Sequence, residues 1–323
     1  MRTQDNLSLD PRMEEQLQQF QIEQEKVQPY MDHPERLTKF MDFRVDYAFK
    51  YILGHKRILM KLINDVFPVQ VTDIEYLGNE IPVVSEKEKR ATFDVICTER
   101  GTGKKFLAEM QCHPDSDMND RLLFYGCTLV HSQIERGDPT YSLKPVYVLC
   151  IANYFRQHTV AVPPGRFFFS YQFRETTAHD DCFTENLQFF FLELPRLRKI
   201  WEALETNLER WCYLFENLSN FAEVPKDPAG FEDVFSVART GTLGEDGLGK
   251  YVTTMVSEYD KRVIGEYFRR EGYAEGRKEG HDAGRKEGRE EGREEGFRLM
   301  AEELRKVGMK EDAIRRIVEK AKL

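Results

Sequence analysis

The sequence predicts a mixed α/β fold, with helices flanking a β-sheet and a helical extension toward the C-terminus. Two short β-type segments joined by a glycine-containing turn indicate an antiparallel strand pair. A nearly continuous apolar run at 145–154, PVYVLCIANY, is typical of a strand that is covered on both faces. Helical spacing of apolar residues before and after these segments supplies the flanking layers.

The first expected elements are two helices. Apolar residues recur at helical spacing over 38–66, where Gly54 divides the stretch and Pro68 ends the second helix. A first β-type segment follows at 71–77. The preceding residues, 1–36, are polar and rich in Gln and Glu, so few apolar positions anchor a helix there.

The paired β-type segments cover 91–98 and 105–112, and the sequence Gly101, Thr102, Gly103 gives the turn between them. The elements expected after this pair are a helix over 117–136 with Asp117 or Asn119 as its N-cap, strands over 145–154, 166–173 and 187–194, and a helix over 196–218. The apolar middle of the chain is therefore able to bury a core.

Composition excludes some classes of protein. No run of 18 apolar residues exists, so no membrane span is expected. The six cysteines are scattered without a CxxC pair, and the first residues, MRTQDNLSLD, lack the apolar core of a signal peptide. We therefore expect a cytoplasmic protein with reduced thiols and no zinc site. The net charge of −9 does not exclude nucleic-acid binding, because a phosphate responds to charge within a Debye length of about 10 Å.

The strand pair carries a candidate metal site. If Gly101 and Thr102 form a two-residue loop, Asp94 lies directly opposite Glu109 with Cβ atoms roughly 5 Å apart. Gln111 shares that face, and a slip of one residue would destroy the arrangement. Two carboxylates this close repel each other unless a cation lies between them, and Mg²⁺ prefers such oxygen ligands. The alternative is a solvated sheet face, but the apolar neighbours on both faces make an unpaired charge costly.

The order of short motifs resembles the Rpn family of recombination-promoting nucleases and putative transposases, a branch of the PD-(D/E)XK superfamily. A helix carries DYAFK at 46–50, one strand carries Asp94, and the next carries EMQ at 109–111. A long helix and the motif LKPVY at 143–147 follow. The resemblance covers about residues 38–215.

This resemblance implies an αβββαβ core and a Mg²⁺-dependent (or Mn²⁺-dependent) DNA endonuclease that promotes recombination or transposition. Asp94 and Glu109 would be metal ligands, with the backbone carbonyl of Met110 as a further ligand. Gln111 takes the position that is usually Lys, so it can orient a water but cannot carry a positive charge. The rival hypothesis is a non-catalytic module that binds nucleic acid or protein on the same fold. These residues do not separate a DNA substrate from an RNA substrate.

Other polar residues leave two interpretations open. Asp46 is a further candidate catalytic residue near the metal, or it forms an i,i+4 pair with Lys50 worth only about 0.3–0.5 kcal/mol. Arg121 and Tyr125 lie one turn apart on the helix after Gln111, where they could face a phosphate backbone or be structural.

The C-terminal segment has seven glycines at every fourth position from Gly272 to Gly296, and each would cost a helix about 1 kcal/mol relative to Ala. The segment is either flexible and charged or a helix whose glycine stripe lets copies of the chain associate. A helix, a turn at Gly308 and a second helix are expected after it. The domain organisation predicted is a polar extension (1–36), a nuclease-like domain (37–218), a linker and helix (219–268) and the charged helical end (269–323).

Overall fold

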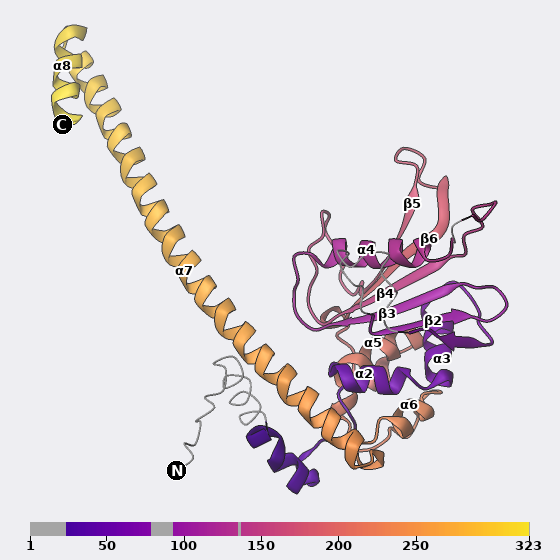
Figure 1. The fold of residues 1–323 in the computed structure, drawn as a ribbon. Coiled ribbons are helices and arrows are strands. Elements are labelled where there is room, and N and C mark those ends of the chain that lie inside the picture. Colours follow the sequence, from indigo (N-terminus) through magenta and orange to yellow (C-terminus); the bar gives the residue numbers. More distant parts are fainter. Residues whose placement is uncertain (1–23, 79–92, 135–136, 323) are drawn as a thin grey trace, which may run out of the picture. The chain divides into compact units, whose positions relative to one another are not determined.

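The computed structural model describes residues 24–78, 93–134 and 137–322 (Figure 1). Two compact units make up the chain, one reaching to Tyr259 and the other beginning at Asp260. The first unit contains the sheet and the helices that cover it. In the second unit, the described secondary-structure elements are helices.

A mixed six-stranded sheet with the strand order β1-β2-β3-β4-β6-β5 forms the centre of the first unit. Strands β3, β4 and β6 run parallel, and the remaining neighbours pair antiparallel. The strands are β1 (Ile74–Tyr76), β2 (Val95–Glu99), β3 (Lys105–Gln111), β4 (Val146–Ala152), β5 (Phe168–Arg174) and β6 (Cys182–Glu193). The predicted α/β class with a mixed sheet is confirmed.

Helices cover both faces of this sheet (Figure 1). Helix α4 (Met118–His131) lies on one face, where its apolar side chains join one core cluster. The opposite face carries α2 (Asp46–Leu53), α3 (Lys56–Val66), α5 (Asn207–Asn217) and α6 (Glu232–Val237) over a larger core cluster. All seven residues of β4 are buried, as the continuous apolar run predicts for a strand covered on both sides. The element order α-β-β-β-α-β expected from the resemblance is present.

Two predicted segments differ most from the structure. The helix expected over 196–218 begins only at Asn207, and short 3₁₀ helices at Leu194–Arg196 and Trp201–Ala203 precede it. The stretch 219–248, part of the segment 219–268 predicted as linker and helix, contributes α6 and the fully buried ring of Phe231 to the core. Burial of aromatic side chains therefore orders this stretch, although its Pro and Gly content favours a loop.

A capping box explains where α5 begins. The Thr206 hydroxyl accepts from the backbone N–H of Glu209 at 3.2 Å, and the Glu209 carboxylate accepts from the N–H of Thr206 at 3.0 Å. Lys199 also donates to Glu209 at 2.6 Å. Burial opposes ionisation of Glu209, but Lys199 and the backbone N–H groups outweigh it and lower the pKa of this carboxyl to about 2.

The substitution Glu209→Gln is expected to lower the free energy of unfolding at pH 7 by roughly 1 kcal/mol. Because the folded-state pKa is depressed, the stabilisation is present above the ordinary value of 4.5 and is lost as pH falls toward 2. Urea denaturation at several pH values should therefore show the variant and the wild type converging in acid. The exposed Glu202 provides a control, Glu202→Gln, which should leave stability nearly unchanged.

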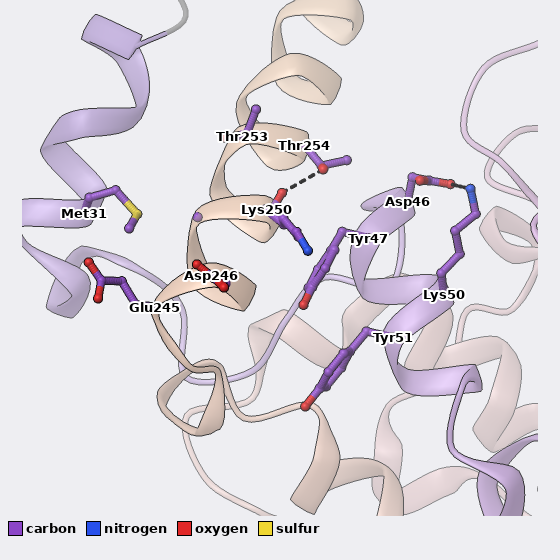
Figure 2. Close-up of a pocket in the computed structure, with 11 residues that line it drawn as sticks. Met31, Asp46, Tyr47, Lys50, Tyr51, Glu245, Asp246, Lys250, Thr253 and Thr254 are labelled. Atoms are coloured by element: carbon purple, nitrogen blue, oxygen red, sulfur yellow. Dashed lines mark hydrogen bonds and ion pairs between the residues drawn. The ribbon is translucent and has the colours of Figure 1, made fainter.

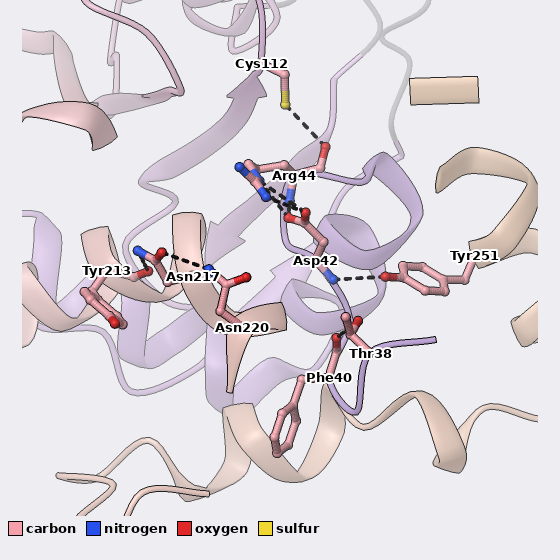
Figure 3. A network of polar contacts seen from close by, with 9 residues as sticks. All are labelled: Thr38, Phe40, Asp42, Arg44, Cys112, Tyr213, Asn217, Asn220 and Tyr251. Atoms are coloured by element: carbon pink, nitrogen blue, oxygen red, sulfur yellow. Dashed lines mark hydrogen bonds and ion pairs between the residues drawn. The ribbon is translucent and has the colours of Figure 1, made fainter. Parts of the chain in front are cut away.

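A polar network fixes the segment that leads into α2 (Figure 3). The backbone N–H of Asp42 donates to the Tyr251 hydroxyl at 3.1 Å, and Arg44 Nη2 donates to Asp42 Oδ2 at 2.7 Å. Cys112, which follows β3 directly, donates from its thiol to the carbonyl of Arg44 at 3.3 Å. The start of α2 is thereby held against the carboxyl end of β3.

The glycine repeat is helical in the structure. Helix α7 (Glu245–Lys306) runs through it without a break, and α8 (Glu311–Lys322) follows a turn at Gly308, which has φ +82°. The predicted helix, turn and second helix are confirmed. A Cβ added at Gly284, Gly288 or Gly292 would meet no heavy atom within 4 Å in the described part of the chain. No helix among the described residues combines the length and the apolar character that a membrane crossing needs.

Candidate active site

The predicted register of the strand pair is confirmed, although the loop is longer than expected. Val95 pairs with Ala108, and the same register continues to Thr98 and Lys105. Residues 100–103 form the loop, since the N–H of Glu99 donates to the carbonyl of Lys104. The longer loop keeps the parity of the pairing, so the side chains stay on the predicted faces.

Asp94 and Glu109 lie at the end of this strand pair and are bound crosswise. Asp94 occupies a bend immediately before β2, and its backbone N–H donates to Glu109 Oε1 at 3.0 Å. The N–H of Met110 donates to Asp94 Oδ2, also at 3.0 Å. Each carboxylate is therefore held by a backbone N–H of the opposing segment, and the two acidic side chains lie close together.

Both acids are withdrawn from water. Glu109 is 8% exposed, and the Asp94 side chain is 20% exposed. Burial raises the pKa of Glu109 well above its usual range, and the charge of Asp94 raises it further. Burial also raises the pKa of Asp94. Two adjacent carboxylates in a low-dielectric site call for a cation, and a donor set of carboxylate oxygens fits a hard divalent ion.

Lys50 is the cation nearest to Asp94 in the described structure. Its Nζ lies 2.7 Å from Asp46 Oδ1 and 3.6 Å from Asp94 Oδ1. The predicted i,i+4 pair of Asp46 with Lys50 therefore exists, and Asp46 also lies close enough for its charge to raise the pKa of Asp94. Lys50 was not among the residues predicted for the site. Its signal was the spacing in DYAFK, which places Lys50 on the same helix face as Asp46.

Gln111 is held by hydrogen bonds within the protein. Arg121 Nη2 on α4 donates to Gln111 Oε1 at 2.6 Å, and Gln111 Nε2 donates to the carbonyl of His113 at 3.1 Å. Arg121 also binds Asp115 at 3.0 Å, and its charge lowers the pKa of Glu109, against the larger effect of burial. A lysine at position 111 would meet the Arg121 guanidinium, so the glutamine avoids a like-charge contact. Positive charge reaches the site from Lys50 and Arg121 instead.

Tyr125 is half-buried one turn after Arg121. Its ring packs against Phe93 with the ring centroids 5.1 Å apart. Burial raises the pKa of Tyr125, and the nearby charge of Glu109 adds to this. Tyr125 thus closes the α4 side of the carboxylate pair.

A groove with a volume of about 1020 Å³ lies beside the site, between α2 and the first turns of α7 (Figure 2). Asp46 and Lys50 line it, as do Tyr47 and Tyr51, whose rings stack with centroids 5.7 Å apart. Lys250 projects into it from α7. The groove reaches the carboxylate pair through Lys50, although Asp94 and Glu109 are not part of its lining.

The mixed sheet with its flanking helices is that of a PD-(D/E)XK nuclease-like protein. The family model described as PD-(D/E)XK nuclease family transposase matches residues 43–266, well over half of the chain. The chain therefore belongs to this family. The matched region contains Asp46, Lys50, Asp94, Glu109 and Gln111. No curated protein and no solved structure matches the chain.

Proposed function

We propose that this protein is a metal-dependent DNA endonuclease that hydrolyses phosphodiester bonds and promotes recombination or transposition. The observation that carries the proposal is the pair of buried carboxylates, Asp94 and Glu109, fixed crosswise at the end of two strands. Membership in a family of nuclease-related transposases supports the reaction class. We also propose that the protein acts in the cytoplasm.

The residues present fit a divalent ion. Asp94 and Glu109 would hold Mg²⁺ or Mn²⁺ through their carboxylates, and the carbonyl of Met110 is the further ligand expected from the resemblance. When bound, the ion supplies Lewis-acid polarisation of the scissile phosphate and lowers the pKa of a coordinated water. The protein contributes a rigid pair of ligands, because each carboxylate is already bound to the opposing backbone.

We assign Lys50 to charge stabilisation at the phosphate. Its ammonium group lies beside Asp94, on the helix that also lines the groove. An ammonium in a partly dehydrated site interacts strongly with negative charge that develops in the transition state. Asp46 orients this ammonium through their 2.7 Å ion pair. Gln111 has the complementary role of holding the Arg121 guanidinium at the other side of the site.

Incubation of the full chain with supercoiled plasmid distinguishes the enzyme from the rival binding module. Nicking or linearisation that requires Mg²⁺ or Mn²⁺ and stops with EDTA supports the proposed function. Retention of plasmid on the protein without any cleavage, in both metals, would favour a module that binds DNA without cutting it. A parallel incubation with single-stranded RNA tests whether DNA is the preferred substrate.

The substitution Lys50→Met is expected to slow cleavage by about 10²-fold. The loss of one well-placed hydrogen-bond donor to developing negative charge has an effect of this size. Methionine keeps most of the side-chain length but removes the charge. Single-turnover rates on plasmid in Mg²⁺ would measure the effect. Lys50→Arg should recover part of the rate, and Asp46→Asn should reduce it less than Lys50→Met. Equal cleavage rates for Lys50→Met and wild type would show that Lys50 forms an ion pair with Asp46 and has no role in catalysis.

We also propose that the glycine-bearing face of α7 mediates self-association. The described glycines leave open space where a second helix could approach closely. The charged side chains between them would then pair across the contact. Sedimentation of the full chain over a range of concentrations tests this, and a monomer at all concentrations would contradict it.

A further inference from the structure

A cationic cavity lies beyond the carboxyl end of β4. It has a volume of about 340 Å³ and is bounded by the loop that follows β4, the first turn of α4 and strand β5. Its polar lining includes Asn119, Arg156, Gln157, His158, Arg166 and Ser170. Among the described residues that line it, none is acidic. A cavity with this lining attracts an anion.

Arg156 is unusually placed for an arginine. Its side chain is only 9% exposed, and its guanidinium lies 3.4 Å from the centre of the Phe191 ring. Nη2 donates to Asn119 Oδ1 at 3.1 Å. Nη1 is buried and has no hydrogen-bond partner, although Glu193 Oε1 lies 4.0 Å away. A buried donor without an acceptor is costly, so a ligand oxygen that accepts from it would relieve that cost.

Glu193, at the end of β6, anchors this cluster without neutralising it. The carboxylate is fully buried, and it binds His158 Nε2 at 2.6 Å and Arg196 Nε at 2.5 Å. One carboxylate thus faces two guanidinium groups, those of Arg156 and Arg196, which leaves a net charge of about +1 before Arg166 is added. The excess positive charge is held in place by packing, so it does not depend on flexible surface side chains.

A chain of contacts links the cavity to the candidate active site. The loop begins where β3 ends, since the N–H of Asn153 donates to the carbonyl of Gln111 at 2.9 Å. A neighbouring cavity of about 420 Å³ shares Asn119 and Arg156 and extends to Asp115. Asp115 binds Arg121, which in turn binds Gln111. Glu109 and Arg156 therefore both lie toward the carboxyl ends of the parallel strands β3 and β4, where one nucleic-acid strand can meet both.

We propose that the Arg156 cavity binds a backbone phosphate of the DNA strand that is cut, at a nucleotide other than the scissile one. Arg156 supplies the buried guanidinium, and Arg166 supplies an exposed one from the start of β5. Guanidinium groups bind phosphate oxygens through paired hydrogen bonds, and stacking on Phe191 fixes the orientation of Arg156 in advance. This inference rests on the proposed function, because it assumes that DNA is the substrate.

The salt dependence of DNA binding tests the inference without any cleavage. Fluorescence anisotropy with a labelled duplex in EDTA would give the slope of log K against log salt for Arg156→Gln and Arg166→Gln. Each lost phosphate contact should reduce the magnitude of that slope by about 0.9 and weaken binding several-fold at low salt. The matched control is Arg100→Gln, in the loop at the opposite end of β3, whose slope should equal that of the wild type.

Thermal denaturation identifies a variant that fails to fold. Arg166 is exposed, so Arg166→Gln keeps the test decisive even if the loss of buried Arg156 unfolds the protein. Unchanged slopes in the folded variants would overturn the phosphate site, even if plasmid cleavage is normal. A reduced slope in a protein that never cuts DNA would support this site while removing the proposed nuclease activity.

Discussion

Replacing Asp94 with asparagine is expected to reduce the rate of DNA cleavage by at least about 1,000-fold, because metal-ion catalysis supplies several kcal/mol of transition-state stabilisation. Asparagine keeps the size of the side chain and an oxygen that can accept from the N–H of Met110. It loses the negative charge that a divalent ion requires. The fold should therefore survive while the reaction is lost.

Single-turnover nicking of plasmid in Mg²⁺ measures this loss, and circular dichroism checks the fold. The matched control is Asp73→Asn, which removes an aspartate just before β1 that pairs with Lys56 and lies outside the candidate site. The control should cut at the wild-type rate. A protein with Asp94→Asn that cuts as fast as the control would mean that Asp94 is not a metal ligand.

The carboxylate pair was predictable because its geometry is local. A hairpin register depends on the parity of the loop, and side chains alternate strictly along each strand. The prediction survived a wrong loop length for this reason, since the residues at 100–103 add an even number to the turn. The flanking helices were predictable from the helical spacing of apolar residues. The strand covered on both faces was predictable from its continuous apolar run, and all of β4 is buried.

The contact of Lys50 with Asp94 and the burial of Arg156 could not be predicted in this way, because they depend on elements that tertiary packing brings together. Lys50 reaches Asp94 only because the segment before α2 is tied to Tyr251, a residue 209 positions from Asp42. Arg156 is buried only because β6 supplies Phe191 and Glu193. Periodicity also extended α5 too far toward its N-terminus, since it took no account of the capping box at Thr206.

The substitution Glu109→Gln is expected to stabilise the metal-free protein and to abolish its stabilisation by metal. Without a cation, the wild type buries two adjacent acids that repel each other when both are ionised. Neutralising one of them removes this repulsion and part of the desolvation cost. The amide introduced by this substitution would retain an oxygen that accepts from the N–H of Asp94. An increase in the melting temperature on the order of 5 °C in EDTA would correspond to roughly 2 kcal/mol.

Added metal should reverse the order of stability, so that the wild type becomes more stable than Glu109→Gln. At a Mg²⁺ or Mn²⁺ concentration of about 100 times the dissociation constant, the wild type gains about 2.7 kcal/mol, whereas the variant gains little. A matched control is Glu99→Gln, which neutralises another buried glutamate of the strand pair. Glu99 pairs with Lys104 at 3.3 Å, so its replacement should destabilise the protein and leave the metal effect intact.

The stability of the metal-free protein should depend on pH because of Glu109. The folded-state pKa of Glu109 lies above its ordinary value of 4.5, so the folded protein retains a proton that the unfolded chain releases. Its stability is therefore greatest below that value and falls as pH rises through the folded pKa, by up to about 1.4 kcal/mol per pH unit. Glu109→Gln should show a smaller decline, the part that Asp94 contributes, when melting temperatures are compared in EDTA between pH 5 and pH 8. A parallel decline in both proteins would place the titrating group elsewhere, and the absence of any metal effect on the wild type would remove Glu109 from the ligand set.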